Sequence, residues 1–159
     1  PGVVFKDITP LLKDPDGFAA VVDTLADHFA DRGVTKVIGA EARGFMIGAP
    51  VAYRLHAGFI PARKPGKLPR ETFSQRYDLE YGSDALEIHV DALGPDDVVL
   101  MIDDLAATGG TAAATARLVE RSGAKVMGLG FLLELAFLDP RKVLAEACDA
   151  EVFSLVQVK

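Results

Sequence analysis

The sequence predicts an α/β fold in which a mainly parallel, twisted sheet is flanked by helices. Apolar runs of strand length alternate along the chain with segments of helical periodicity, the order that βαβ units produce. Several of these runs have no polar interruption, which is typical of strands buried on both faces of a parallel sheet. The 159 residues, 50% of them hydrophobic, predict one globular domain spanning residues 1–159.

Capping residues and the spacing of apolar residues predict the first two helices and the first two strands. Asp14-Pro15 supplies an N-cap and a proline at the first helical position. Apolar residues then recur at helical spacing up to the helix stop Gly33, namely Phe18, Val21, Val22, Leu25 and Phe29. The run Val34–Ala40 predicts a buried strand, Arg43–His56 an apolar helix, and Gly58–Arg63 a second strand.

Residues 64–84 predict a long excursion from the sheet, because they combine prolines and glycines with many polar groups. Irregular segments of this length inside a compact domain are usually functional, so we expect a mobile lid loop here. Further elements follow in the order strand, strand, helix, strand, helix, strand: Ala85–Val90, Val98–Ile102, Thr111–Gly123, Val126–Glu134, Pro140–Cys148 and Val152–Val158.

The most informative stretch is Val98–Thr111. Five apolar residues lead into Asp103 and Asp104, then into a turn of small residues that opens an alanine-rich helix. In open α/β sheets, ligands bind beyond the carboxyl ends of the strands, which is where this acid pair falls. The amide groups of the small-residue turn can approach a ligand closely, and a helix N-terminus favours an anion. The pattern therefore predicts a site for a sugar phosphate.

Two basic segments predict further anion contacts. Gly39–Gly44 follows another predicted strand and opens a helix, and its Arg43 can donate a forked pair of hydrogen bonds to phosphate oxygens. Arg63, Lys64 and Lys67 follow the next strand beside two prolines, which suits a diphosphate clamp. On the residues alone, a plain turn with an exposed arginine and a solvated loop stay open as alternatives.

Composition and missing motifs exclude several classes of protein. A net charge of −6 argues against nucleic-acid binding, and no apolar stretch approaches the roughly 20 residues of a membrane span. The one cysteine, Cys148, excludes a disulfide framework and fits a cytoplasmic setting. His28, His56 and His89 lack the spacing of metal ligands. The chain also lacks a P-loop and a G-x-G-x-x-G fingerprint, so P-loop NTPases and Rossmann dehydrogenases find no support.

The run Val98–Thr111 resembles the phosphoribosyl pyrophosphate signature of type I phosphoribosyltransferases. Together with Pro1–Ile8, Arg63–Arg70 and Tyr77–Gly82, it is similar to the adenine-using members of that family, and the similarity extends to Val158. The resemblance implies that ribose 5-phosphate is transferred from phosphoribosyl pyrophosphate to N9 of adenine, giving AMP and pyrophosphate. It also implies Mg²⁺ that arrives with the substrate rather than in a dedicated protein site, and a homodimer.

The resemblance also implies roles for individual residues. Glu80 would act on the lid as general acid/base, and Asp103 and Asp104 would hold the ribose hydroxyls. The 5′-phosphate would lie on the turn formed by Ala107, Thr108, Gly109, Gly110 and Thr111. The pyrophosphate would be held by Arg43, Lys64 and Lys67, and the adenine by Val4 and Phe5 under the strand end Leu133–Leu135.

Two further expectations come from the resemblance. One is a non-proline cis peptide near Glu41–Ala42, a kind of backbone strain tolerated at functional sites. The other is a helix of the family that would precede Pro1-Gly2 and is missing from this sequence.

Three alternative functions are compatible with parts of the sequence. A relative that uses another purine, such as xanthine, would share the ribose phosphate site. A non-catalytic regulator on the same fold would carry a basic face and lack a lid acid, whereas this chain has Glu80 and a net charge of −6. A generic phosphate-binding scaffold is the third alternative, because a fold alone does not decide function.

Overall fold

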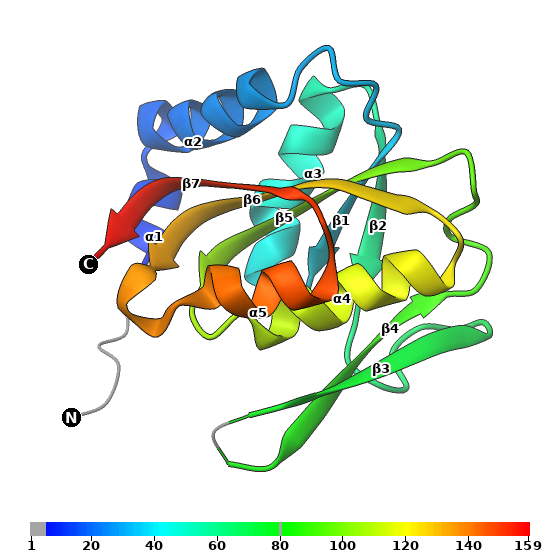
Figure 1. The fold of residues 1–159 in the computed structure, drawn as a ribbon. Helices are drawn as coiled ribbons and strands as arrows, with labels where there is room; N and C mark the ends of the chain where they lie inside the picture. Colours follow the sequence, from blue (N-terminus) through cyan, green and yellow to red (C-terminus); the bar gives the residue numbers. More distant parts are fainter. Residues whose placement is uncertain (1–5, 80) are drawn as a thin grey trace.

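Parallel strands form the central sheet of the protein, which we describe from a computed structural model over residues 6–79 and 81–159. Within these residues the sheet has five strands in the order β2-β1-β5-β6-β7 (Figure 1), and all of its pairs are parallel. Their bounds are Lys36–Ala40 (β1), Gly58–Ala62 (β2), Val98–Ala106 (β5), Lys125–Leu135 (β6) and Glu151–Val158 (β7). The predicted fold class is confirmed.

Helices cover both faces of this sheet. Helices α2 (Pro15–His28) and α3 (Arg43–Arg54) pack on one face, whereas α4 (Gly110–Arg121) and α5 (Pro140–Ala147) lie on the other (Figure 1). Neighbouring residues of one strand therefore enter different core clusters, as Val37 and Ile38 of β1 do. This double burial explains why the strands read as unbroken apolar runs. None of the helices in the described residues is long and apolar enough to cross a membrane.

The start of α2 follows the predicted capping. The Asp14 Oδ2 atom accepts a hydrogen bond from the Gly17 amide at 3.2 Å, and Pro15 occupies the first turn. The helix ends at His28, earlier than predicted, and Gly33 adopts a φ of +76° in the connection to β1. Other boundaries differ from the predictions by a few residues, and the short helices α1 (Thr9–Lys13) and η1 (Ala136–Leu138) were not predicted.

The order of the strands reverses between β1 and β5. From β1 the chain moves through α3 to β2 on one side, whereas β5, α4 and β6 continue on the other. Ligands bind at such a switch point in open α/β sheets, because the connections leave the two neighbouring strands in opposite directions. Lys36–Ile38 pairs with Val99–Met101, so the longer β5 carries Asp103 and Asp104 beyond its pairing with β1, while Asp103 stays paired with Phe131 of β6.

The segment 64–84 leaves the central sheet as predicted, but it is not irregular throughout. Residues Thr72–Asp78 form the strand β3, which pairs antiparallel with β4 (Ser83–His89) in a hairpin below α4 (Figure 1). Consequently the predicted strand Ala85–Val90 belongs to this hairpin and not to the central sheet. The half-buried Phe73 and Tyr77 pack against the core that contains α4, so this segment has an apolar side that its prolines and polar residues concealed.

The connection from β1 to α3 contains a cis peptide bond between Glu41 and Ala42. The expectation of a non-proline cis bond at this position is confirmed.

Candidate functional site

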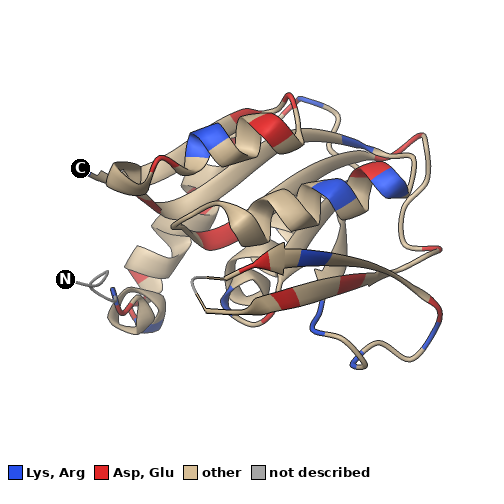
Figure 2. Cartoon of the chain, turned by 60° about the horizontal axis from the view of Figure 1, so that its bottom comes forward, with Lys and Arg blue, Asp and Glu red and all other residues tan. Residues whose placement is uncertain are grey.

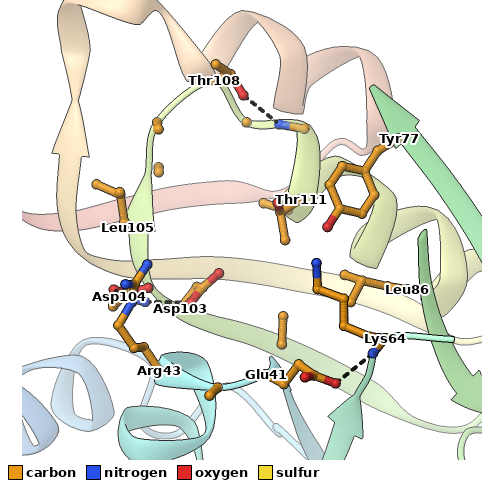
Figure 3. Close-up of a pocket in the computed structure, with 17 residues that line it drawn as sticks. Glu41, Arg43, Lys64, Tyr77, Leu86, Asp103, Asp104, Leu105, Thr108 and Thr111 are labelled. Carbon is orange, nitrogen blue, oxygen red and sulfur yellow. Dashed lines mark hydrogen bonds and ion pairs between the residues drawn. The ribbon is translucent and has the colours of Figure 1, made fainter. Parts of the chain in front are cut away.

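A pocket of about 440 Å³ opens at the carboxyl ends of β1 and β5, next to the hairpin (Figure 3). It brings together segments that are far apart in the sequence: the β1–α3 turn, the start of the basic segment, both hairpin strands and the β5–α4 turn. The lining residues include most of the predicted site, namely Arg43, Lys64, Asp103, Asp104, Ala107, Thr108, Gly109, Gly110 and Thr111.

The two acids of the pocket lie almost out of water, with Asp103 9% and Asp104 6% exposed. The Asp104 amide donates to Asp103 Oδ1 at 2.8 Å, and Arg43 Nε lies 2.6 Å from Asp104 Oδ2. Gly44 allows α3 to pack close behind the pair, because a Cβ there would lie 3.1 Å from Asp103 Oδ1. Both acids are therefore held by their surroundings before any ligand arrives.

Burial raises the pKa of Asp103 well above its usual range, and the hydrogen bond and negative charge of Asp104 raise it further. The Asp104 amide and the Arg43 guanidinium oppose this rise only in part. A carboxyl group in this state is stabilised by hydroxyl donors or by positive charge that a ligand brings into the pocket.

The turn Ala107–Thr111 joins β5 to α4 and forms one wall of the pocket. Gly109 caps the helix at a φ of +90°, a conformation that other residues rarely adopt. The turn presents little side-chain bulk, and the Thr108 hydroxyl lies 3.5 Å from the Gly110 amide. Free amide groups at a helix N-terminus make this wall suited to a phosphate group.

Lys64 supplies a cation on the opposite side. Its side chain extends into the pocket toward Tyr77 and Thr111 (Figure 3). Its Nζ forms an ion pair with Asp84 of β4. The hydrogen bond with Asp84 raises the pKa of Lys64 above its usual range, so the ammonium charge is secure. In the view of Figure 2, basic positions follow one another along the loop that leads into the hairpin.

Glu41 connects the basic segment 63–67 to the β1–α3 turn. It accepts hydrogen bonds from the Lys64 amide at 2.7 Å and from Lys67 Nζ at 2.8 Å, and Arg63 Nε lies 3.4 Å away. Burial raises the pKa of Glu41, but these hydrogen bonds and the charges of Lys67 and Arg63 outweigh it, so the net pKa is lowered. Lys67 is held by Glu41 and does not line the pocket.

Comparisons with known proteins show the family of this chain. Residues 8–157 match the family model of the phosphoribosyl transferase domain. The adenine phosphoribosyltransferase of Desulfitobacterium hafniense is 54% identical over 157 residues, covering 99% of this chain and 89% of the relative. The chain belongs to the adenine phosphoribosyltransferase family.

Solved adenine phosphoribosyltransferases have the same fold. The enzyme of Thermoanaerobacter pseudethanolicus superposes with a TM-score of 0.94 at 50% identity, covering 99% of this chain and 90% of that one. The enzyme of Saccharomyces cerevisiae, in complex with adenine and a dideoxy-imino-altritol bisphosphate, gives a TM-score of 0.89 at 39% identity, covering 98% and 88%.

Some residues predicted for an adenine phosphoribosyltransferase site stay untested. Val4, Phe5 and Glu80 lie outside the described residues. The strand end Leu133–Leu135 falls at the end of β6, as predicted, but is not among the residues that line this pocket.

Several lining residues were not predicted for the site, and three of them, Glu41, Tyr77 and Leu86, contribute larger side chains from outside the β5–α4 segment. Glu41 stands two positions before Arg43 in a turn already singled out, so its neighbourhood was a usable signal. Tyr77 and Leu86 enter the site only because β3 and β4 pair, which no local pattern had suggested.

Proposed function

We propose that the protein transfers ribose 5-phosphate from phosphoribosyl pyrophosphate to N9 of adenine, releasing pyrophosphate and giving AMP. The observation that supports this most is one pocket in which a buried acid pair faces an amide-lined turn across a space of about 440 Å³. That combination suits a pentose that carries both hydroxyls and a phosphate. The adenine phosphoribosyltransferases among the relatives favour adenine as the acceptor.

In this proposal Asp103 and Asp104 accept hydrogen bonds from the ribose hydroxyls. As pyrophosphate leaves, positive charge develops at the glycosidic carbon, and nearby carboxylates offset it. Ionising the buried Asp103 carboxyl costs free energy, and a positive centre in the pocket reduces that cost. The acids therefore stabilise the positively charged transition state more strongly than they stabilise the neutral sugar.

The two phosphate ends of the donor have separate sites. The amides of Ala107–Thr111 hold the 5′-phosphate at the start of α4. Arg43, Lys64 and Lys67 hold the pyrophosphate: Lys64 already reaches into the pocket, whereas Lys67 has to exchange Glu41 for the ligand. These cations neutralise the charge that accumulates on the leaving group.

Mg²⁺ fits this donor set as an ion carried by the substrate. The described residues hold no group of three or more acidic, histidine or cysteine side chains that could bind a metal by themselves. Mg²⁺ is commonly held by substrate phosphates, water and one or two carboxylates, and the pair Asp103 and Asp104 offers the carboxylates. When bound, the ion would neutralise charge on the leaving pyrophosphate.

For the acceptor we propose Val4 and Phe5 as the adenine contacts and Glu80 as general acid/base at the purine ring. Glu80 falls in the sequence between the end of β3 and the start of β4, next to a strand that lines the pocket. Closure of a lid over both substrates would exclude the water that hydrolyses a cation-like ribosyl centre.

Replacing Glu80 by Gln tests this role. We expect kcat to fall about 100-fold while the KM for adenine changes little, because the change removes proton handling and leaves the shape of the side chain intact. Glu71→Gln, at an exposed acid of the same segment, is the control. Unchanged turnover in Glu80→Gln would remove Glu80 from the chemistry.

We also propose a homodimer and a cytoplasmic location. Met46 and Tyr53 of α3 are 45% and 87% exposed and stand seven positions apart, so one helix face presents apolar surface that a second copy can cover. Sedimentation with Met46→Glu as the disrupting variant tests the dimer. The single cysteine fits a reducing compartment, which cell fractionation tests.

An ultraviolet assay with adenine, hypoxanthine, guanine and xanthine, each with phosphoribosyl pyrophosphate and Mg²⁺, tests the proposed reaction. We expect AMP from adenine and little turnover of the other bases. Preference for another base would overturn the acceptor and leave the family intact. Full activity in the presence of EDTA would overturn the requirement for Mg²⁺.

A further inference from the structure

A buried carboxylate outside the pocket, Glu134 of β6, is surrounded by donors. It is 2% exposed and accepts hydrogen bonds from Arg141 Nε at 2.8 Å and from a second Arg141 nitrogen, Nη2, at 2.9 Å. Ser154 Oγ at 2.7 Å and Gln157 Nε2 at 3.3 Å, both on β7, complete the set among the described residues. These donors, with the Arg141 pair as the largest cause, lower the pKa of Glu134, so the carboxylate is ionised.

Joining a sheet to a helix through such a group costs free energy, because the charged carboxylate is removed from water. The Glu134 side chain is 3% exposed and that of Arg141 is 45% exposed, so the pair is buried on the carboxylate side, and a buried charge of this kind rarely stabilises a fold more than well-packed apolar side chains of the same volume would. Its forked geometry, by contrast, fixes one orientation of the arginine, since both guanidinium nitrogens must face the carboxylate. The pair therefore sets a position more than it adds stability.

The position that it sets is the first turn of α5. Arg141 follows Pro140, the residue that opens this helix. A Cβ added to Gly109 would lie 2.9 Å from the Pro140 carbonyl oxygen and 3.2 Å from Val143 Cβ. The first turn of α5 is thus the surface against which the phosphate-binding turn rests, on the side away from the pocket.

Glu134 is joined to the same turn by a second route. In the parallel pairing of β5 and β6 it stands opposite Ala106, the last residue of β5 before the turn begins. Glu134 therefore stands, by its backbone, beside the strand end from which the turn Ala107–Thr111 leaves, and its carboxylate holds, through Arg141, the helix that supports the middle of the turn.

We propose that Glu134 and Arg141 are positioning residues for the 5′-phosphate turn: by clamping the start of α5 behind Gly109 they hold its amides in the geometry that binds a phosphorylated pentose. This inference rests on the proposed function in one respect, that the ligand of the turn is the 5′-phosphate. Neither residue touches the substrate.

The test compares full-length wild-type protein with Arg141→Met, Arg141→Lys and Glu134→Gln. Titration calorimetry with ribose 5-phosphate reports the turn directly, and steady-state kinetics report the KM for each substrate. We expect about tenfold weaker ribose 5-phosphate binding and a similar rise in the KM for phosphoribosyl pyrophosphate, because small misplacements of a binding group are costly. The KM for adenine should not change. Arg141→Lys should fall between wild type and Arg141→Met, since lysine keeps the charge but not the fork.

A matched control separates positioning from loss of stability. Lys36 Nζ and Asp97 Oδ1 form an ion pair at 2.9 Å, at the opposite end of the sheet from the pocket. Lys36→Met leaves one acid without its partner, as Arg141→Met does. It should lower Tm without weakening ribose 5-phosphate binding. Where Arg141→Met fails to fold by circular dichroism, Arg141→Lys is read in its place.

Wild-type affinity for ribose 5-phosphate in the folded Glu134 and Arg141 variants would overturn the inference, and so would an equal loss in Lys36→Met. If the wild type binds ribose 5-phosphate but does not consume adenine, the proposed acceptor fails and the comparison of variants still decides the inference. If the wild type does not bind ribose 5-phosphate, the turn has been misassigned and both proposals fall.

Discussion

At the scale of single residues, the acid pair shows a site that is built at the expense of stability. Asp103 and Asp104 are nearly buried, and burial together with the charge of Asp104 increases the cost of ionising Asp103. Arg43 compensates for Asp104 at 2.6 Å, but the pKa of Asp103 stays raised. The proposed catalytic role accounts for two carboxyl groups at a place where apolar residues would pack at lower cost.

Replacing Asp103 by Asn should therefore raise or preserve stability and abolish most of the activity. With its pKa raised in the folded state, Asp103 binds more protons folded than unfolded, so its contribution to stability falls as the pH rises above the normal range of aspartate. At pH 7.5 the amide removes this cost, while kcat/KM should fall about 100-fold with the lost electrostatic stabilisation. Thermal unfolding and the adenine assay measure the two effects.

Asp97→Asn is the control, because its expected effect on stability has the opposite sign. Burial raises the pKa of Asp97, but hydrogen bonds from Lys36, Gly94 and Thr35 outweigh it and lower the net pKa. This variant should lose stability at pH 7.5 and keep its activity. A lower Tm in Asp103→Asn than in wild type would contradict the expected direction of the stability change.

Gly109 gives a second test at this scale. At a φ of +90°, with the Pro140 carbonyl oxygen 2.9 Å from the place of a Cβ, Gly109→Ala combines backbone strain with a collision. We expect a loss of about 1–3 kcal/mol from the strain, a further loss from the collision, and a raised KM for phosphoribosyl pyrophosphate. Chemical denaturation and kinetics measure them.

Gly123→Ala isolates the strain. Gly123 also has a positive φ, +83°, but no atom lies within 4 Å of its added Cβ. It should lose stability by the strain alone and leave the KM unchanged. Equal effects in the two alanine variants would mean that the contact with Pro140 is unimportant.

At the scale of elements, the hairpin β3–β4 performs two tasks at once. Its apolar side, with Leu86 and Ile88 fully buried, packs into the core that contains α4, and Leu86 also lines the pocket. The polar side meets water. The same strand thus contributes to folding and to the shape of the site.

Truncating Leu86 and Ile88 separates the contribution of the hairpin to folding from its contribution to the shape of the pocket. Leu86→Ala and Ile88→Ala should each destabilise the protein by about 2–5 kcal/mol, the range for large-to-small changes in a core. Leu86→Ala should also raise the KM for phosphoribosyl pyrophosphate, because it enlarges the pocket. Ile88→Ala, which does not line it, should not. Kinetics at a temperature where both variants are folded decide this, and an equal change in KM would assign both effects to general loosening.

The sequence patterns predicted the central sheet and the acid-bearing strand end, because both are encoded within short windows: an apolar run, two acids and a small-residue turn. The second strand of the hairpin was predicted, at Ala85–Val90, but β3 was expected to be irregular because neighbouring prolines and polar residues hid its apolar side and its pairing is set by tertiary packing against α4. Glu41 gained its partners only when β1 and β2 came side by side, and Glu134 only when β7 and α5 closed around it. Contacts of that kind have no local signature.

At the scale of the whole molecule, carboxylates with lowered pKa values join elements that are distant in sequence. Glu134 links β6 to α5 and β7, Glu151 links β7 to His28 and Arg32 near the end of α2, and Asp97 links the start of β5 to β1. Protonation of these carboxylates at acid pH removes the links, so the sheet and the helices packed on it are destabilised at the same time.

We therefore predict a steep loss of stability in acid. Hydrogen bonds from Arg32 and His28 lower the pKa of Glu151, as those from Arg141 do for Glu134. A lowered folded-state pKa contributes stability that is present above the ordinary value of 4.5 and is lost as the pH falls through the folded-state value. Asp103 acts in the opposite direction, but as one group against several.

Thermal unfolding from pH 7 to pH 3 measures this loss. Glu134→Gln should flatten the acid limb more than Glu151→Gln, because the Glu134 side chain is 3% exposed and that of Glu151 is 42% exposed and better screened by water. An acid limb that neither variant alters would mean that other groups control acid unfolding.

The hairpin is attached to the rest of the protein mainly by side-chain packing: in the described residues, the backbone bridge between Arg63 and Glu87 is the one outside the named strands. Substitutions along it can therefore accumulate without shifting the register of the parallel strands. Exchanging the hairpin between related enzymes would therefore alter one wall of the pocket, at Tyr77 and Leu86, on an unchanged scaffold.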